Sequence, residues 1–217
     1  MARPSPKKLA HAREVLAALR EQVPEPRCEL VHRNAWELLV ATILSARSTD
    51  RGVNKVTPVL FARYPTPRAL AAAPQPAVEK LVHSTGFFRQ KTKAIREVSS
   101  AIAQRHGGVV PRTMGELTKL RGVARKTANV VLGTAYGVAS GVVVDVHVTR
   151  VAERLGLTRH QDPLKIEQDL MVLFDESEWI DLGHRLVLHG RYTCTARKPK
   201  CDLCACAPVC PSAFRFS

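Results

Sequence analysis

Acidic residues are scarce in this chain relative to basic ones. Lys and Arg number 33 against 19 Asp and Glu, which gives a formal net charge of +14 over 217 residues. A balance of this sign indicates an anionic partner, and nucleic acid is the commonest one. A surface of acidic lipid is the alternative that charge alone leaves open.

The chain also lacks the apolar stretches of secreted and membrane proteins. Residues 1–22 form a short Leu/Ala pattern studded with Lys and Arg, without the apolar core of a secretory signal, so we expect a cytoplasmic protein. The longest uncharged run, residues 127–144, has the length of a membrane span. Its polar residues and its glycines at 133, 137 and 141 favour a buried helix that ends in a glycine-rich turn, so we expect no membrane contact. In a reducing compartment the six cysteines are expected to be ligands or core residues rather than disulfides.

No segment has a convincing strand pattern, and the fold class is predicted to be all-α with short helices. Residues 142–144 are three valines, but they are too isolated to build a sheet. Apolar residues recur at intervals of three and four in residues 36–44, 94–102 and 166–174. Helix starts are expected at Thr66-Pro67, at Asp162-Pro163 and at the capping box from Thr113 to Glu116. Prolines 58, 65, 67, 74 and 76 are expected to cut the stretch after residue 50 into short helices.

Four cysteines near the C-terminus are close enough in sequence to hold one metal centre. Cys194, Cys201, Cys204 and Cys210 have the spacing C-x6-C-x2-C-x5-C within a basic segment. Zinc is the competing interpretation, although zinc ribbons generally combine two CxxC-like pairs and only Cys201 and Cys204 form one here. Cys206 is an extra thiol inside this loop.

A second pattern spans residues 117–132 and predicts a helix, a tight turn at Gly122 and a second helix. Backbone N–H groups of such a turn and of the following helical turn bind phosphate oxygens, and the helix dipole adds to the attraction. The grip is to the backbone of a nucleic acid and carries no sequence information. An ordinary corner between two helices is the alternative that this turn alone does not exclude.

These two patterns together resemble one family. Leu120-Arg-Gly-Val-Ala-Arg-Lys-Thr-Ala128, followed by Val144-Asp145-Val-His147-Val-Thr-Arg150-Val, is similar to the helix-hairpin-helix and catalytic aspartate of the endonuclease III DNA glycosylases. Leu188-His-Gly-Arg-Tyr-Thr-Cys194 and the cysteines after it resemble the iron–sulfur loop of that family. The resemblance extends over most of the chain, from residue 36 to residue 210.

The resemblance implies a two-domain helix-hairpin-helix DNA glycosylase fold. Residues 30–140 would form a six-helix barrel that ends in the hairpin. Residues 1–29 and 141–217 would form the iron–sulfur domain, with a [4Fe–4S] cluster held by Cys194, Cys201, Cys204 and Cys210 rather than by Cys206. DNA would lie across the cleft between the domains, where Lys126 and Asp145 would face each other.

The implied activity is base-excision repair by a bifunctional glycosylase and abasic-site lyase that acts on oxidised pyrimidines in duplex DNA. Lys126 would attack the sugar as a neutral amine, form a Schiff base and lead to β-elimination. Asp145 would stabilise the positive charge that develops on the sugar and relay protons, although a plain helix cap is also compatible with its position. A monofunctional glycosylase for mismatched or alkylated bases and a non-catalytic iron–sulfur DNA-binding scaffold are the alternative functions.

The resemblance also implies a set of DNA contacts. Thr85-Gly-Phe87-Phe88-Arg-Gln-Lys91 resembles the wedge loop of the family. Phe87 takes the place of the leucine that the family inserts into the base stack, unless both phenylalanines belong to the core. Arg47 stands where the family usually has glutamine, and it would contact either the orphaned base, preferably guanine, or a phosphate. Arg121 replaces a usual proline and adds charge, and Ala124 replaces a usual glycine, where we expect strain or a more distant phosphate.

The expected partner is double-stranded DNA with damaged bases or abasic sites, bound by a monomer associated with the nucleoid. The expected DNA-contacting residues are Arg47, Phe87, Leu120, Gly122, Ala124, Arg125, Thr127, His147, Arg191, Lys198 and Lys200.

Overall fold

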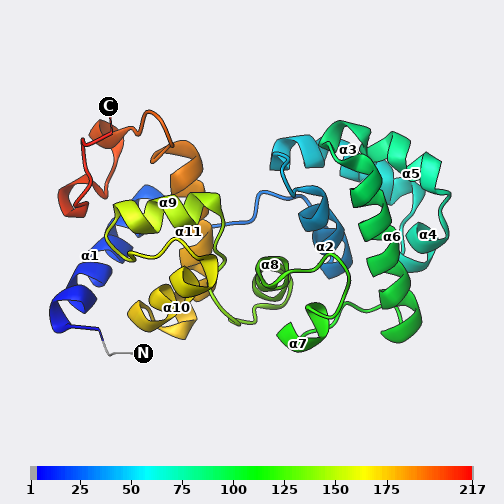
Figure 1. The fold of residues 1–217 in the computed structure, drawn as a ribbon, viewed down its shortest axis with the longest axis horizontal. Coiled ribbons are helices and arrows are strands. Elements are labelled where there is room, and N and C mark those ends of the chain that lie inside the picture. The colour runs from blue at the N-terminus through cyan, green and yellow to red at the C-terminus, as the bar shows by residue number, and fades with distance from the viewer. Residues whose placement is uncertain (1–3, 217) are drawn as a thin grey trace. The chain divides into compact units, whose positions relative to one another are not determined.

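The computed structural model describes residues 4–216, and these residues form helices and connecting loops without a β-strand (Figure 1). The all-α prediction is therefore confirmed. The α-helices are α1 (Pro6–Gln22), α2 (Ala35–Leu44), α3 (Asp50–Arg63), α4 (Pro67–Ala72), α5 (Gln75–Val82), α6 (Phe88–Arg105), α7 (Met114–Leu117), α8 (Arg125–Tyr136), α9 (Val146–Arg154), α10 (Pro163–Leu173) and α11 (Trp179–Tyr192). Short 3₁₀ helices are η1 (His83–Thr85), η2 (Glu176–Glu178), η3 (Cys201–Leu203) and η4 (Ala207–Val209).

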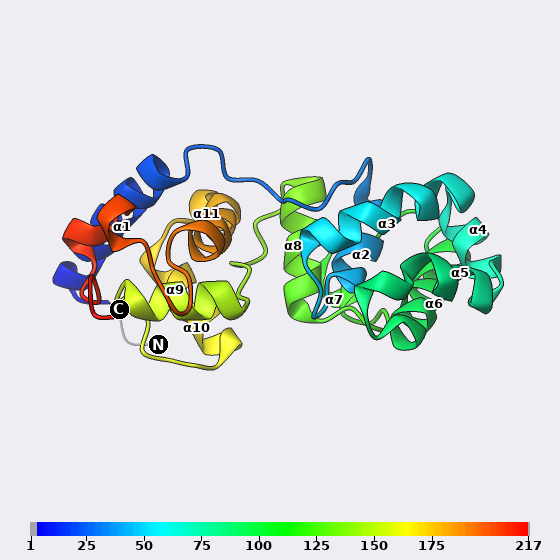
Figure 2. The same ribbon diagram turned by 90° about the horizontal axis from the view of Figure 1, so that it is seen from above.

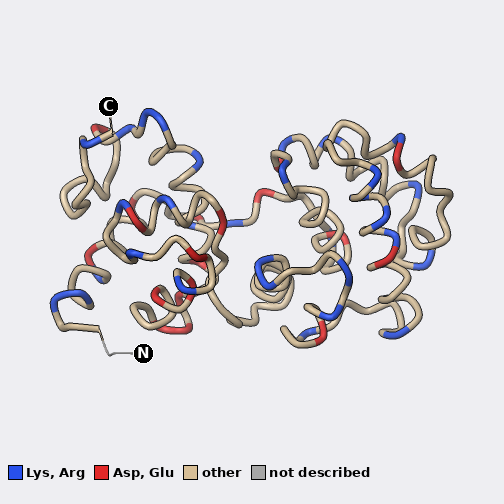
Figure 3. Tube along the Cα trace, viewed as in Figure 1, with Lys and Arg blue, Asp and Glu red and all other residues tan. Residues whose placement is uncertain are grey.

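The helices divide between two compact units, which Figures 1 and 2 show from two directions. The first unit combines Met1–Arg27 with Ala139–Ser217, and the second is the continuous segment Cys28–Val138. Lys and Arg occur on helices and loops of both units (Figure 3). Among the described residues no helix is both long and apolar enough to cross a membrane.

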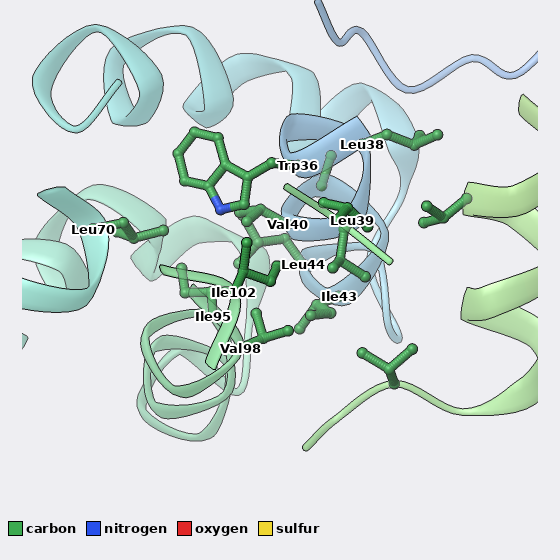
Figure 4. Packing of buried hydrophobic residues seen from close by; sticks show 14 of the residues in the cluster. Trp36, Leu38, Leu39, Val40, Ile43, Leu44, Leu70, Ile95, Val98 and Ile102 are labelled. Carbon is green, nitrogen blue, oxygen red and sulfur yellow. The ribbon is translucent and has the colours of Figure 1, made fainter. Parts of the chain in front are cut away.

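The second unit is built around α2. Every residue of this helix from Trp36 to Leu44 is buried, as expected of a helix that is apolar on all sides and surrounded by others. This helix packs against α3, α6 and α8, and Figure 4 shows part of the core around it. The Trp36 ring lies 5.4 Å from that of Phe61, and its indole N–H donates to the Ser99 hydroxyl at 3.1 Å.

Helix starts in the sequence are confirmed where a cap residue marks them. The side chains of Thr66, Thr113 and Asp162 each accept a hydrogen bond from the first turn of α4, α7 and α10. The expectation that Pro58 breaks a helix is wrong, because α3 continues through it. Pro58 is exposed, so water can satisfy the carbonyl that loses its partner, while buried Leu60 and Phe61 hold the helix to the core.

The first unit joins segments that are far apart in the sequence. α1 packs with α9, α10 and α11 over a common apolar core. The His11 ring bonds to the Leu155 carbonyl at 2.7 Å, and the Gln22 side chain accepts the N–H of Ala205 at 2.7 Å. The valines at 142–144 are in an irregular segment that leads to the start of α9.

Candidate functional site

The predicted helix-hairpin-helix pattern forms a tight turn between α7 and α8. Gly122 has a φ of +81°, a conformation that side chains disfavour, and a Cβ atom there would lie 3.3 Å from that of Ala94 on α6. The Val123 N–H donates to the Leu120 carbonyl at 3.1 Å and closes the turn. Leu120 itself is buried with its N–H bonded to Leu117, so its side chain anchors the hairpin from inside.

Ala124 begins α8 without strain. Its φ of −81° and ψ of 165° are ordinary extended values, so the expectation that alanine strains this position is wrong. Alanine has no side-chain oxygen, so Ala124 cannot accept a hydrogen bond from the backbone N–H groups in the first turn of α8. Arg125, Lys126 and Thr127 follow in that turn, and Lys126 is exposed.

Arg121, which was expected to add charge to the hairpin, is paired within the unit. Its guanidinium contacts the Glu97 carboxylate of α6 at 3.0 Å and 3.2 Å. The ion pair is largely solvent-exposed, so its main effect is to offset the charge of Arg121 and to tie the turn to α6.

Asp145 caps α9 in the first unit. Its Oδ1 accepts the N–H groups of His147 and Val148 at 2.8 Å and 3.0 Å, so the capping interpretation is correct and the cap fixes the orientation of the carboxylate. His147 is half-buried, its ring lies 3.3 Å from the Arg150 guanidinium, and burial lowers its pKa. Lys126 and Asp145 thus each lie at the start of a helix, one in each unit.

Phe87 and Arg47 lie together on the second unit. The Phe87 side chain is 53% exposed, whereas Phe88 is partly buried against the core, which removes the alternative that both are core residues. The Arg47 guanidinium is 4.8 Å from the centre of the Phe87 ring, a cation–π contact. Both residues have left-handed backbones, with φ of 56° and 48°. They line one open cavity with Lys91, Gly122 and Thr127.

The four cysteines of the C-terminal motif line a single cavity in the first unit. Cys194, Cys201, Cys204 and Cys210 all border it, together with Arg154 and His189. Four sulfur atoms around one space are a donor set suited to a tetrahedral zinc ion or to an iron–sulfur cluster. The residues present therefore fit a metal group of this kind.

N–H groups surround the cysteine sulfurs. The Arg154 guanidinium lies 3.5 Å from the sulfur of Cys194, and the Phe214 backbone N–H donates to that of Cys201 at 3.4 Å. The His189 ring is 3.9 Å from the sulfur of Cys204. Such donors stabilise thiolates and the negative charge of a thiolate-bound cluster.

Cys206 is in a different environment from the four other cysteines of the loop. It is fully buried in the apolar core and is not among the residues that border the cavity. Its thiol lies beside Cys204 and His189, and these three donor atoms are within 4.8 Å of one another. The hydrogen bond to Cys204 and burial raise the pKa of Cys206, while the same bond lowers that of Cys204. Because Cys204 borders the cavity and Cys206 does not, the geometry favours Cys204 as the ligand.

The predicted phosphate contacts around the cysteines are accessible. Lys198 and Lys200 are exposed and Arg191 is half-buried. The loop that presents the lysines is held by bonds from the Lys200 N–H to the Thr193 carbonyl at 3.0 Å and from the Thr195 hydroxyl to the Lys198 carbonyl at 2.6 Å.

The functional importance of three residues at these sites was not recognised from the sequence. Arg154 is buried and binds the carbonyls of residues 195 and 196, and His189 and Lys91 are buried as well. The spacing of Arg150 and Arg154 on one face of a helix was the available signal, because both hold the segment that begins the cysteine loop. Lys91 ends the segment that resembles the wedge loop, but its burial and its bond to Thr85 become apparent only in the folded chain.

Comparison with known proteins gives consistent results. A model of the HhH-GPD superfamily base excision DNA repair proteins matches residues 40–176. Endonuclease III of Synechocystis sp. is 50% identical over 206 residues, which cover 95% of this chain and 94% of that protein. Endonuclease III of Bacillus subtilis is 44% identical over 191 residues, or 88% and 87% of the two chains.

Solved structures agree with the sequence matches. The structure of a trapped endonuclease III–DNA covalent intermediate, an estranged-adenine complex, is 40% identical with a TM-score of 0.90, and the match covers 95% of this chain and 97% of that one. A thermostable thymine-DNA glycosylase has the same fold, with a TM-score of 0.82 at 21% identity over 96% and 98% of the chains.

Proposed function

The chain belongs to the endonuclease III family of HhH-GPD base excision DNA repair proteins, DNA glycosylases that are also abasic-site lyases, and we propose that it removes oxidised pyrimidines from duplex DNA with Lys126 as nucleophile. The observation that carries this proposal is the position of the exposed residue Lys126 in the first turn of α8, just after the Gly122 turn. A lysine amine at this position can act as the nucleophile that forms a Schiff base with the sugar.

The proposed reaction uses one amine and one carboxylate. The Lys126 amine attacks C1′ of the sugar, the bond to the base breaks, and the base leaves with the electron pair and takes up a proton. Opening of the sugar ring gives a Schiff base between C1′ and the lysine. Loss of a proton from C2′ expels the 3′ phosphate by β-elimination, and water then releases the amine. A trapped covalent intermediate of an endonuclease III with DNA supports this route.

Asp145 supplies the negative charge in this proposal. Its carboxylate stabilises the positive charge on the sugar as the base departs and takes the proton that the attacking amine gives up. Because two N–H groups of α9 bind Oδ1, the cap holds the carboxylate in one orientation. Capping and catalysis are therefore compatible roles for this residue.

Borohydride trapping on an abasic duplex tests the lysine directly. Wild type and the control Lys119→Ala, which removes an exposed lysine of the same hairpin, are expected to give a covalent adduct, and Lys126→Ala none. An adduct that persists in Lys126→Ala contradicts the assignment. Binding without an adduct in wild type supports the scaffold function, and base release without an adduct supports a monofunctional glycosylase.

We also propose that Cys194, Cys201, Cys204 and Cys210 hold a [4Fe–4S] cluster with a structural role. The four thiols at one cavity and the N–H donors to their sulfurs support it. Such a cluster would supply thiolate–iron bonds that order the loop carrying Lys198 and Lys200. A broad visible absorption and about four iron atoms per chain are expected, whereas a colourless protein containing zinc contradicts the proposal.

The DNA grip combines the hairpin with the basic loop. Backbone N–H groups near Gly122, together with Lys198 and Lys200, bind phosphates in this proposal. Alanine at either lysine is expected to weaken binding to any duplex and to reduce the slope of log affinity against log salt by about one. An unchanged slope excludes that lysine as a contact. We propose that it acts on this substrate at the nucleoid, as a monomer.

Arg47 and Phe87 form the wedge that fills the space left by an everted nucleotide. Their stacked, exposed side chains support this role. Arg47 is expected to contact the orphaned base and to favour guanine by two hydrogen bonds. Rates of base release opposite guanine and adenine should differ less in Arg47→Gln than in wild type, and an unchanged ratio would assign Arg47 to phosphate binding instead.

A further inference from the structure

A buried lysine holds both ends of the loop that presents Phe87. Lys91 lies in the first turns of α6 and its residue is only 6% exposed. Its ammonium donates to the carbonyl oxygen of Thr85 at 2.6 Å, and its backbone N–H donates to that of Phe87 at 3.1 Å. Lys91 thus bonds to two backbone carbonyls of this loop, that of Thr85 and that of Phe87.

The loop between these two bonds is in an unfavourable conformation. Gly86 and Phe87 have φ values of 70° and 48°, and for phenylalanine the left-handed region is costly. The Phe87 ring is half-exposed, so burial of the ring does not compensate for this cost. A backbone of this kind persists where its surroundings fix it, and the charge-assisted bond from Lys91 to Thr85 is such a constraint.

Burial of an ammonium is itself unfavourable, and it lowers the pKa of Lys91. A core lysine that served only to fill space would be replaced at lower cost by an apolar side chain of similar length. Lys91 also borders the cavity that contains Arg47, Phe87 and the hairpin residues Gly122 and Thr127. Its position therefore connects the wedge with the element that grips the DNA backbone.

We infer that Lys91 is a positioning residue for base eversion: its bond to the Thr85 carbonyl sets the direction in which the Phe87 ring enters the base stack. The inference rests on the wedge role proposed for Phe87. Because Lys91 is buried, it acts in this inference through the Phe87 loop, and its effect is confined to the step that opens the duplex.

Two substrates separate this step from the chemistry. One duplex carries the lesion in a fully paired context, and the other carries it in a bulge, where the nucleotide is already unstacked. The ratio of single-turnover base-release rates, paired over bulged, is measured with the same enzyme preparation. Because the fraction of folded enzyme cancels in this ratio, partial unfolding of a variant does not alter it.

Lys91→Met, which keeps the length and burial of the side chain, is expected to lower this ratio by about tenfold, since duplex opening costs enough to become limiting. Lys93→Met removes an exposed lysine from the same helix and should leave the ratio unchanged. Lys91→Arg, which retains charged N–H donors, should restore most of the ratio. A fluorescent base analogue beside the lesion should also show a smaller unstacking signal with Lys91→Met. An unchanged ratio in Lys91→Met, or an equal loss in Lys91→Arg, overturns the inference.

Phe87→Ala distinguishes failure of the inference from failure of the wedge proposal. If Phe87 is the wedge, its alanine variant lowers the same ratio, and adding Lys91→Met to it changes nothing further because the two act at one step. If Phe87→Ala leaves the ratio intact, the wedge proposal fails and the inference fails with it. If Phe87→Ala lowers the ratio and Lys91→Met does not, only the role of Lys91 is refuted.

Discussion

Replacement of Gly190 by alanine should destabilise the first unit and disturb the start of α9. Gly190 lies on α11, where this helix comes closest to α9. A Cβ atom at Gly190 would be 2.9 Å from the Cβ of His147 and 3.0 Å from a methyl carbon of Val151. The Cβ of His147 is bonded directly to the backbone of α9, so rotation of a side chain cannot relieve this overlap and the helices must move apart.

The size of the effect follows from two opposing contributions. Overpacking of a tight contact costs about 1–3 kcal/mol, while alanine in place of glycine within a helix recovers roughly 0.5–1 kcal/mol. The difference spans about 0–2.5 kcal/mol, and because the 2.9 Å contact is with a Cβ atom we expect the upper half of this range, which lowers the thermal midpoint of a unit of this length by several degrees. The Gly190 carbonyl also accepts the Arg150 guanidinium at 2.8 Å, so this bond is strained as well.

Thermal unfolding followed by circular dichroism measures the loss, and borohydride trapping reports the state of Asp145 at the head of α9. Gly115→Ala is the matched control, because a Cβ there meets nothing within 4 Å, and it should be neutral or stabilising. A Gly190→Ala protein as stable as wild type would refute the reasoning, since it would mean that α9 and α11 separate at no cost.

Three further predictions concern the hairpin, the cysteine loop and acid stability. Gly122→Ala should cost about 1–2 kcal/mol because of its φ of +81°, and should weaken binding to undamaged duplex in a titration; equal affinity would exclude the turn from the DNA contact. Cys206→Ser should retain the visible absorption and iron content of the purified protein, and Cys204→Ser should lose both. The opposite result would make Cys206 the ligand and Cys204 the thiol that does not bind the cluster. Burial lowers the pKa of His184; the unfolded chain therefore binds the proton more tightly, and stability is lost as pH falls below about 6.5, the unfolded value. His184→Gln, which does not titrate, should show a smaller fall in thermal midpoint between about pH 7 and pH 5, and an identical fall would remove His184 as a cause.

Structural features that depend on residues close together in the sequence were predicted correctly. Periodic apolar residues and cap residues such as Thr113 and Asp145 act within one or two helical turns, and these helix starts are where the pattern placed them. Pro58 was misread, because its cost depends on whether the freed carbonyl faces water, which only the packed structure decides. The pairing of Arg121 with Glu97 was equally invisible to a local pattern.

The same distinction applies to the residues of the candidate site, some of which could be predicted from the sequence and some not. Motif spacing marked the hairpin, Asp145 and the cysteines, since each motif is contiguous in the chain. Arg47 and Phe87 stack although three α-helices and one 3₁₀ helix separate them, and the buried side chain of Lys91 bonds to Thr85 in the loop before its own helix. Contacts of this kind depend on tertiary structure, so a single sequence does not reveal them.

The bond between Gln22 and Ala205 has a consequence for biosynthesis. As the polypeptide leaves the ribosome, all of Cys28–Val138 emerges before the partner of Gln22 has been translated. The continuous unit can therefore fold on the nascent chain, while the apolar residues of α1 stay exposed to water until α9, α10 and α11 have been made. The bond between Gln22 and Ala205 forms after that and completes the attachment of α1.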